Sequence, residues 1–359
     1  MEQPTRRQFL AGSAALAAGL AGCTAGRRPP ATPIERIQAD AQEAADAPGE
    51  TTYASVYEAT IDSVVFVGDE RAGGSGFVHN GHVVTNEHVV DEIADVNVRF
   101  ERGEWREAAV RGADPYSDLA VLATDVPTYA TSLPFVEQVP PVGTEVLALG
   151  SPFGLASSLS QGVISGRNRS LPNPETGFSI PNTVQTDAGL DPGNSGGPLV
   201  TMDGEVTGIA VAGAGTAVGF AVSPLLARRV LPELAETGSY DHPYLGILLV
   251  EVTPTIAEAN DLAEPTGIMV VELAADGPTG QTLEPADGET VVDGRPVPTG
   301  GDVLVELAGE PIESENDLAT TLALSLTPGD RVVAVVIRDG EEREIDVPIG
   351  TRPSPEERG

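Results

Sequence analysis

The nine residues Asp191–Leu199, DPGNSGGPL, are the most informative stretch of this sequence. They place Ser195 among glycines, which adopt the backbone conformations that a tight turn requires. On such a turn a serine hydroxyl can stand beside backbone N–H groups that stabilise an oxyanion. A short glycine–serine string alone is a weak signal, because flexible loops contain many of them. The interpretation therefore depends on the rest of the chain.

Two upstream segments contain the partners that a serine nucleophile needs. TNEHVV (Thr85–Val90) contains His88, and SDLAVL (Ser117–Leu122) contains Asp118. A serine hydroxyl needs a base, and the imidazole of that base needs an acceptor that fixes its tautomer. Each residue alone has an ordinary structural explanation, such as a cap or a core contact. In the order His88, Asp118, Ser195, which is that of chymotrypsin-type triads, they predict a catalytic triad.

Short apolar, β-branched runs separated by glycine and proline predict a mainly β fold of the barrel or sandwich type. One such run is Ile61–Val67. A helix is predicted over Pro224–Glu236, with Ser223 as its N-cap, and it closes the first domain. After Tyr240 a second, smaller domain of mixed type begins. Within it, the acidic, Gly- and Pro-rich stretch Ala274–Gly301 is interpreted as a loop insertion.

The motifs together resemble the HtrA/DegP/DegQ family of serine proteases. The resemblance covers residues 52–350 and rests on TNEHVV, SDLAVL, GSPFGL, QTDAGLDPGNSGGPL and GFAVS. It implies a chymotrypsin/trypsin-like double β-barrel over residues 51–238, a smaller α+β PDZ domain over 239–350 and a tail over 351–359.

The resemblance also implies a role for each site residue. His88 is the general base, Asp118 orients it and Ser195 is the nucleophile. The backbone amides of Gly193 and Ser195 are the oxyanion donors. In the family, the segment Ala210–Gly219 shapes the pocket for the residue before the cleaved bond, and its small side chains predict cleavage after Val, Ala, Leu or Ile.

Glu87 departs from the family pattern, which usually has alanine there. Two interpretations stay open: it raises the pKa of His88, or it points to solvent, and we expect solvent because unpaired buried carboxylates are costly. The other histidines, His79, His82 and His242, show no metal-ligand grouping and are expected at the surface or in turns. No nucleotide or metal motif occurs, so no cofactor is expected.

The segment Tyr244–Ile247, YLGI, resembles the carboxylate-binding loop of a PDZ domain. The residues Tyr244, Leu245, Gly246 and Ile247 would hold a C-terminal carboxylate with their backbone amides, while the peptide adds as a strand. The alternative is the ordinary start of a strand.

The composition is strongly acidic, with 54 Asp and Glu, 20 basic residues that are all arginine, and a formal net charge of −34. A nucleic-acid partner is therefore not expected. Because the carboxylates are spread along the chain, we interpret them as a salt-adapted surface from a halophilic source, an archaeon, in preference to an ordinary acidic protein or an acidic tail.

The first 22 residues resemble a twin-arginine signal peptide with a lipobox. Arg6 and Arg7 precede the apolar stretch Ala11–Ala21, which is shorter than the roughly 20 residues of a membrane span. Cys23, the only cysteine, stands where such a signal attaches a lipid; an incidental cleavage region is the alternative. Residues 23–50 are expected to form a flexible linker. The expected location is the cell envelope, lipid-anchored to the outer face of the cytoplasmic membrane.

Two functions follow. The first is an ATP-independent serine endopeptidase that degrades unfolded or damaged envelope proteins and whose PDZ domain binds peptide C-termini. By resemblance it is a homotrimer, using aromatic residues near Tyr53 and Tyr57. The alternative is a chaperone or peptide-binding scaffold with little or no proteolytic activity.

Overall fold

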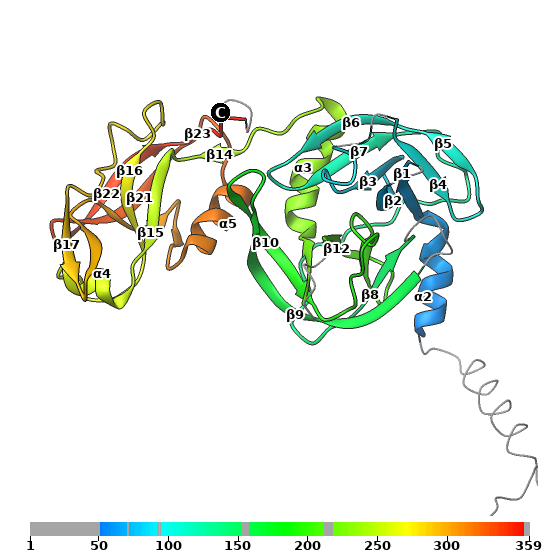
Figure 1. Cartoon of the computed structure of the whole chain (residues 1–359), viewed down its shortest axis with the longest axis horizontal. Coiled ribbons are helices and arrows are strands. Elements are labelled where there is room, and N and C mark those ends of the chain that lie inside the picture. Colours follow the sequence, from blue (N-terminus) through cyan, green and yellow to red (C-terminus); the bar gives the residue numbers. More distant parts are fainter. Residues whose placement is uncertain are drawn as a thin grey trace, which may run out of the picture. The chain divides into compact units, whose positions relative to one another are not determined.

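Antiparallel strands dominate the computed structural model, which describes residues 51–69, 72–91, 93, 95–151, 158–211 and 218–354 (Figure 1). The predicted mainly β class is confirmed. The signal segment, Cys23 and the linker lie outside the described residues. So do residues 152–157, which include the last four residues of the GSPFGL motif, and residues 212–217 of the predicted specificity segment.

The first half of the first domain is a seven-stranded sheet, preceded by a short helix and a 3₁₀ turn. The strand predicted from Ile61 begins only at Val64, because the first three residues form the 3₁₀ turn. Asn80 and Gly81, both with positive φ, close a two-residue hairpin turn, which favours residues that tolerate this conformation. The sheet order is β5-β4-β1-β2-β3-β7-β6. The bounds are α2 (Tyr53–Thr60), η1 (Ile61–Ser63), β1 (Val64–Gly68), β2 (Gly73–His79), β3 (His82–Thr85), β4 (Asn97–Phe100), β5 (Trp105–Glu107), β6 (Ala109–Asp114) and β7 (Leu119–Ala123).

The second half is a closed barrel in the order β10-β13-β12-β11-β8-β9. Strand β10 was not predicted from the sequence, because Pro181 interrupts the alternation of apolar and polar residues. At this point Asn182 has a positive φ and the pairing register with β9 shifts. The bounds are β8 (Glu145–Gly150), β9 (Ser158–Asn173), β10 (Phe178–Thr186), β11 (Pro198–Thr201), β12 (Val206–Val211) and β13 (Gly219–Val222).

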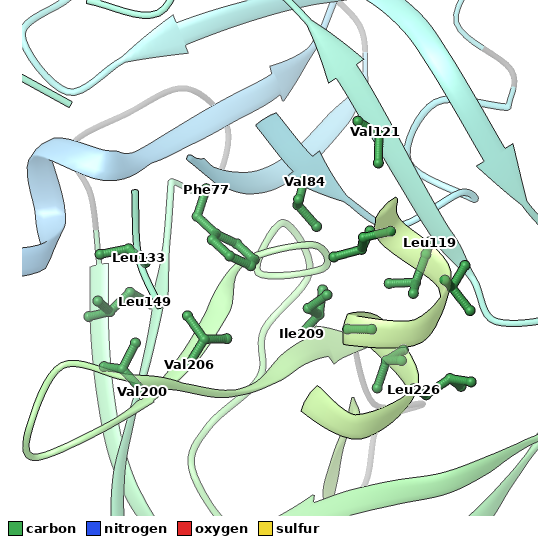
Figure 2. Close-up of a cluster of buried hydrophobic side chains, with 14 of the residues drawn as sticks. Phe77, Val84, Leu119, Val121, Leu133, Leu149, Val200, Val206, Ile209 and Leu226 are labelled. Carbon is green, nitrogen blue, oxygen red and sulfur yellow. The ribbon is translucent and has the colours of Figure 1, made fainter. Parts of the chain in front are cut away.

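One hydrophobic core joins the two halves (Figure 2). Phe77 and Leu119 from the sheet meet Val200 and Ile209 from the barrel, and all four are buried. Leu226 enters this cluster from helix α3 (Pro224–Glu236). The helix has the predicted bounds, and Ser223 caps it by accepting a hydrogen bond from the backbone N–H of Leu226. Packing of the two halves therefore fixes the surfaces on which the site residues lie.

The second domain contains a five-stranded path, β15-β16-β19-β21-β22, with β20 paired to β19. Beside it lie the hairpin β17–β18 and a short pairing of β14 with β23. It continues from the first within one compact unit, Thr51–Gly359. The bounds are β14 (Pro243–Tyr244), β15 (Ile247–Glu251), α4 (Pro254–Ala259), β16 (Ile268–Leu273), β17 (Gly288–Val292), β18 (Arg295–Thr299), β19 (Val303–Leu307), β20 (Glu310–Pro311), α5 (Glu315–Ser325), β21 (Arg331–Arg338), β22 (Glu341–Pro348) and β23 (Gly350–Thr351).

The prediction that Ala274–Gly301 is a loop insertion is wrong in part, because this stretch contains the hairpin β17–β18. The signal was the dipeptide Asp293-Gly294, whose positive φ angles form the two-residue turn. The strand was not predicted because β18 contains two prolines, which are uncommon in strands. Proline is tolerated there because β18 has a partner on one side only, as an edge strand does.

A buried ion pair ties this insertion to the sheet. The Arg338 guanidinium contacts both oxygens of Asp302, Nε to Oδ1 at 2.6 Å and Nη2 to Oδ2 at 2.7 Å, and Asp302 is fully buried. The same Nη2 donates to the carbonyl of Thr282 at 3.1 Å, and Asp302 accepts from the backbone N–H of Glu284. Removal of the arginine would therefore strand a buried carboxylate.

We predict that Arg338→Met lowers the free energy of unfolding by about 3–5 kcal/mol, since one partner of a buried pair is lost. The matched control is Arg343→Met, whose ion pairs with Asp339 and Glu341 are exposed, and it should cost at most about 1 kcal/mol. Urea denaturation followed by far-UV circular dichroism measures both. Equal losses in the two variants would contradict the structural role of the buried pair.

Candidate active site

The predicted acid, Asp118, occupies the turn between β6 and β7 in an uncommon conformation. Its φ is 53°, a left-handed value that few residues other than glycine adopt. Its backbone carbonyl accepts a hydrogen bond from Asn86 Nδ2 at 2.8 Å, and only 5% of the residue is exposed. The backbone of Asp118 is thus held by the segment that carries His88.

His88 binds this carboxylate through both its backbone and its ring. Nδ1 lies 2.9 Å from each Asp118 oxygen, and the backbone N–H of His88 donates to Oδ1 at 3.1 Å. Because an ionised carboxylate only accepts hydrogen bonds, this geometry places the ring proton on Nδ1. The neutral ring then offers the lone pair of Nε2, the nitrogen that acts as base in a serine triad.

The backbone of β2 holds the turn that carries Ser195. The backbone N–H of Ser75 donates to the carbonyl of Ser195 at 2.7 Å, and Ser75 Oγ donates to the carbonyl of Gly193 at 2.6 Å. A Cβ added to Gly74 would lie 2.7 Å from the same Ser195 oxygen and 2.8 Å from Val89 Cγ2. The serine therefore lies across Gly74 from the residue that follows His88.

Gly196 makes this close approach possible. Its φ is +83°, and a side chain there would begin 2.1 Å from the carbonyl of Ser75 and 2.3 Å from Thr85 Oγ1. Gly193, with φ +98°, gives the turn its second left-handed residue. Gly196 is thus required by sterics as well as by conformation, and Gly193 by conformation.

A cavity of about 160 Å³ lies beside the His88–Asp118 pair. Glu175, from the turn between β9 and β10, also lines this cavity. This residue was not identified from the sequence. No local motif marks Glu175; only the hairpin formed by the two strands places it there. The lining residues are Glu87, His88, Asp118, Leu171, Pro172, Asn173, Pro174, Glu175, Ile180 and Val211.

Glu87 lines this cavity half-buried, so the expectation that it points to solvent is wrong. Burial, followed by the charges of Asp91, Asp118 and Glu175, raises the pKa of Glu87 to about 7. Burial alone would lower the pKa of His88. The hydrogen bond and charge of Asp118, with the charges of Glu87 and Glu175, raise it above its ordinary value.

The remaining histidines do not line the cavity beside His88. His79 is half-buried and its Nδ1 is 2.8 Å from the carbonyl of Leu133, while His82 contacts the carbonyl of Asn80. The expectation of a surface or turn position is wrong for His242, which is 6% exposed and bound to Asp114. Across the residues that the structure describes, no group of three His, Cys, Asp or Glu side chains could hold a metal ion.

The predicted peptide-binding loop, Tyr244–Ile247, borders a cavity of about 280 Å³. Its lining comes from β15, α5 and the segment before β15, together with residues of the first domain such as Tyr116 and Phe178. Gly246 has φ +72°, and its carbonyl accepts from the backbone N–H of Ala274 at 2.8 Å. Apolar side chains on both elements, Ile247, Leu318 and Leu322 among them, line the cavity. A strand and a helix that flank an apolar groove can hold an extended peptide.

Two family models match the chain, a trypsin-like peptidase domain over residues 74–209 and a PDZ domain over residues 243–349. Among curated proteins, a "Probable periplasmic serine endoprotease DegP-like" of Pseudomonas fulva is 35% identical over 291 residues, which is 78% of this chain and 56% of the relative. A protein of the same description from Halomonas elongata is 33% identical over 79% of this chain and 58% of the relative. The chain thus spans little more than half the length of these relatives.

Solved structures give a similar result. A serine endoprotease from Yersinia pestis matches with a TM-score of 0.62 and 27% identity, covering 85% of this chain and 100% of that one. The HtrA-type protease AlgW with a tripeptide matches with a TM-score of 0.69 and 27% identity, covering 85% and 99%. Both matches extend across the peptidase and PDZ regions.

We predict that Glu87→Gln lowers the pKa of His88, because the variant removes a negative charge that stabilises the imidazolium. An NMR titration of the His88 ring in both proteins measures the change. Glu107→Gln, an exposed change on β5 and outside the cavity, should leave the His88 pKa unaltered. An unchanged or higher pKa in Glu87→Gln would show that Glu87 does not act on His88.

Proposed function

The chain belongs to the HtrA family, with a trypsin-like peptidase domain followed by a PDZ domain, and from this we propose that it is an ATP-independent serine endopeptidase that degrades unfolded or damaged proteins. The observation that carries the proposal is the His88 ring, bound through Nδ1 to both oxygens of Asp118 while the Ser195 turn lies against the neighbouring backbone.

In the proposed reaction, Ser195 Oγ attacks the carbonyl carbon of the scissile peptide bond as His88 Nε2 takes the hydroxyl proton. The carbonyl oxygen becomes an oxyanion, which the backbone amides of Gly193 and Ser195 stabilise. The intermediate collapses, the C–N bond breaks, and His88 gives its proton to the leaving amine. Water then hydrolyses the acyl-enzyme by the same route, and Asp118 stabilises the imidazolium in both halves.

The groove beside Tyr244–Ile247 is the proposed site for the C-terminus of a substrate or regulatory peptide. The open strand β15 and the apolar lining support this role. The alternative function, a chaperone or peptide-binding scaffold with little proteolytic activity, would use the same groove. The ordered His88–Asp118 pair favours the protease.

We further propose that the protein is exported to the cell envelope and anchored by a lipid on Cys23, since the curated relatives are described as periplasmic and the first 23 residues resemble a lipoprotein signal. None of the helices among the described residues is long and apolar enough to cross a membrane. A homotrimer using α2 and its neighbours is the proposed assembly. Within one chain, the hydroxyl of Tyr53 in α2 donates a hydrogen bond to Glu145 of β8, which fixes this helix against the barrel.

We predict that Ser195→Ala abolishes digestion of an unfolded protein in molar salt, with a rate at least about 10⁴-fold below that of the unaltered chain, because the nucleophile is lost. The variant should still bind a peptide C-terminus. Ser239→Ala, an exposed serine between α3 and β14, is the matched control and should cleave normally. If neither the unaltered chain nor Ser195→Ala cleaves and both keep the client soluble, the scaffold function is correct and the protease is not.

The net charge of −34 predicts that the fold depends on salt, and the halophilic source remains part of this proposal. Raising KCl from about 0.1 M to about 1 M shortens the Debye length from about 10 Å to about 3 Å and screens the repulsion among carboxylates. The thermal midpoint should therefore rise by several degrees, and NaCl at equal ionic strength should have a similar effect. A midpoint that ignores salt would refute the halophilic interpretation.

A further inference from the structure

A buried histidine of the interdomain linker contacts the turn that carries Asp118. His242 lies between α3 and β14, and its Nε2 is 2.8 Å from Asp114 Oδ2. The side chains are only 6% and 4% exposed. A carboxylate so far from water is stable only when its oxygens receive hydrogen bonds. His242 supplies one of these from an element outside the β6–β7 turn.

Asp114 organises the turn that ends at Asp118. It is the last residue of β6, and its carboxylate accepts from the backbone N–H groups of Tyr116 at 3.3 Å and Ser117 at 3.1 Å, and from the Ser117 hydroxyl. Burial opposes the charge of Asp114, but the hydrogen bonds from His242 and Ser117 hold its pKa below the ordinary value. The group therefore stays an acceptor for all these donors.

This arrangement explains how Asp118 keeps its left-handed backbone. A residue with such a φ stays there only where its surroundings determine the conformation. On one side Asn86 binds the Asp118 carbonyl, and on the other Asp114 binds the backbone N–H groups of the two preceding residues. A loosened Asp114 would release the turn and, with it, the carboxylate that holds His88.

Residues that follow the last strand of the second domain also contact this turn. The Tyr116 hydroxyl donates to the carbonyl of Pro353 at 2.5 Å, and the Arg352 guanidinium lies 4.8 Å from the Tyr116 ring centroid. The backbone N–H of Arg352 donates to the carbonyl of His242 at 2.8 Å. The Tyr116 and His242 rings meet edge to face at 5.3 Å, and both line the groove beside Tyr244–Ile247.

We propose that His242 is a positioning residue of the active site: its hydrogen bond to Asp114 holds the Asp114–Asp118 turn in the conformation in which Asp118 receives His88. His242 directly precedes β14, the first strand of the second domain, so the residue that leads into this domain also supports the triad. The inference rests on the proposed function only in taking the His88–Asp118 pair as catalytic.

Two amide variants that differ in reach test this proposal in the full chain. The amide nitrogen of His242→Gln can occupy the place of Nε2 and donate to Asp114, whereas that of His242→Asn ends too early. The first readout is kcat and KM on a short fluorogenic peptide with an aliphatic residue before the cleaved bond. The second is the downfield proton resonance of His88 Nδ1–H, which reports the bond to Asp118 without any cleavage.

We expect His242→Asn to lower kcat by roughly tenfold or more, at nearly unchanged KM, and to weaken or broaden the resonance, because a displaced triad reacts slowly. His242→Gln should restore both. Asn316→Ala removes a different contact between the domains, with Asn168 and Ser170, and should change neither readout. If His242→Asn unfolds by circular dichroism, His242→Phe fills the same space without a donor and is measured in its place.

Wild-type kcat and a wild-type resonance in His242→Asn would overturn the proposal, as would equal losses in the Asn and Gln variants. If the unaltered chain cleaves no substrate, the proposed protease function fails, and the resonance alone decides the role of His242.

Discussion

The contact between strand β2 and the Ser195 turn is the constraint on which the rest of the site depends. The backbone N–H of Ser75 donates to the carbonyl of Ser195, and its hydroxyl donates to the carbonyl of Gly193. The turn therefore packs directly against the strand. That approach is possible only because Gly74 and Gly196 have no side chains. The barrel supplies the turn and the sheet supplies β2, and their shared core keeps the two surfaces together.

Buried carboxylates determine most of the remaining geometry, and each described one has its partners. Asp118 is bound by His88, Asp114 by His242 and Ser117, and Asp302 by Arg338. In a chain with 54 acidic residues, these three stand out because the surrounding structure satisfies their charge. Glu87 differs: it is half-buried near other carboxylates, and its pKa is raised accordingly.

Short sequence patterns predicted those features that depend on neighbouring residues, such as helix caps and strands. Helix α3 follows from its serine cap, and strand β1 begins within the β-branched run Ile61–Val67. The family resemblance named His88, Asp118 and Ser195 from short motifs. Contacts between distant segments had no such signal, because Glu175 reaches the site through the β9–β10 hairpin and His242 through the linker. Strand β18 was missed for a different reason, since its prolines outweighed the Asp293-Gly294 turn signal.

The central claim is that the fold activates Ser195 through His88, and covalent labelling tests it most directly. A fluorophosphonate reacts with an activated serine as the Oγ–P bond forms, the P–F bond breaks and fluoride leaves with the hydroxyl proton. Peptide mass spectrometry then locates the adduct. The account predicts one adduct, on Ser195, that is lost in His88→Ala. An unlabelled chain, a label on another serine, or equal labelling in His88→Ala would contradict it.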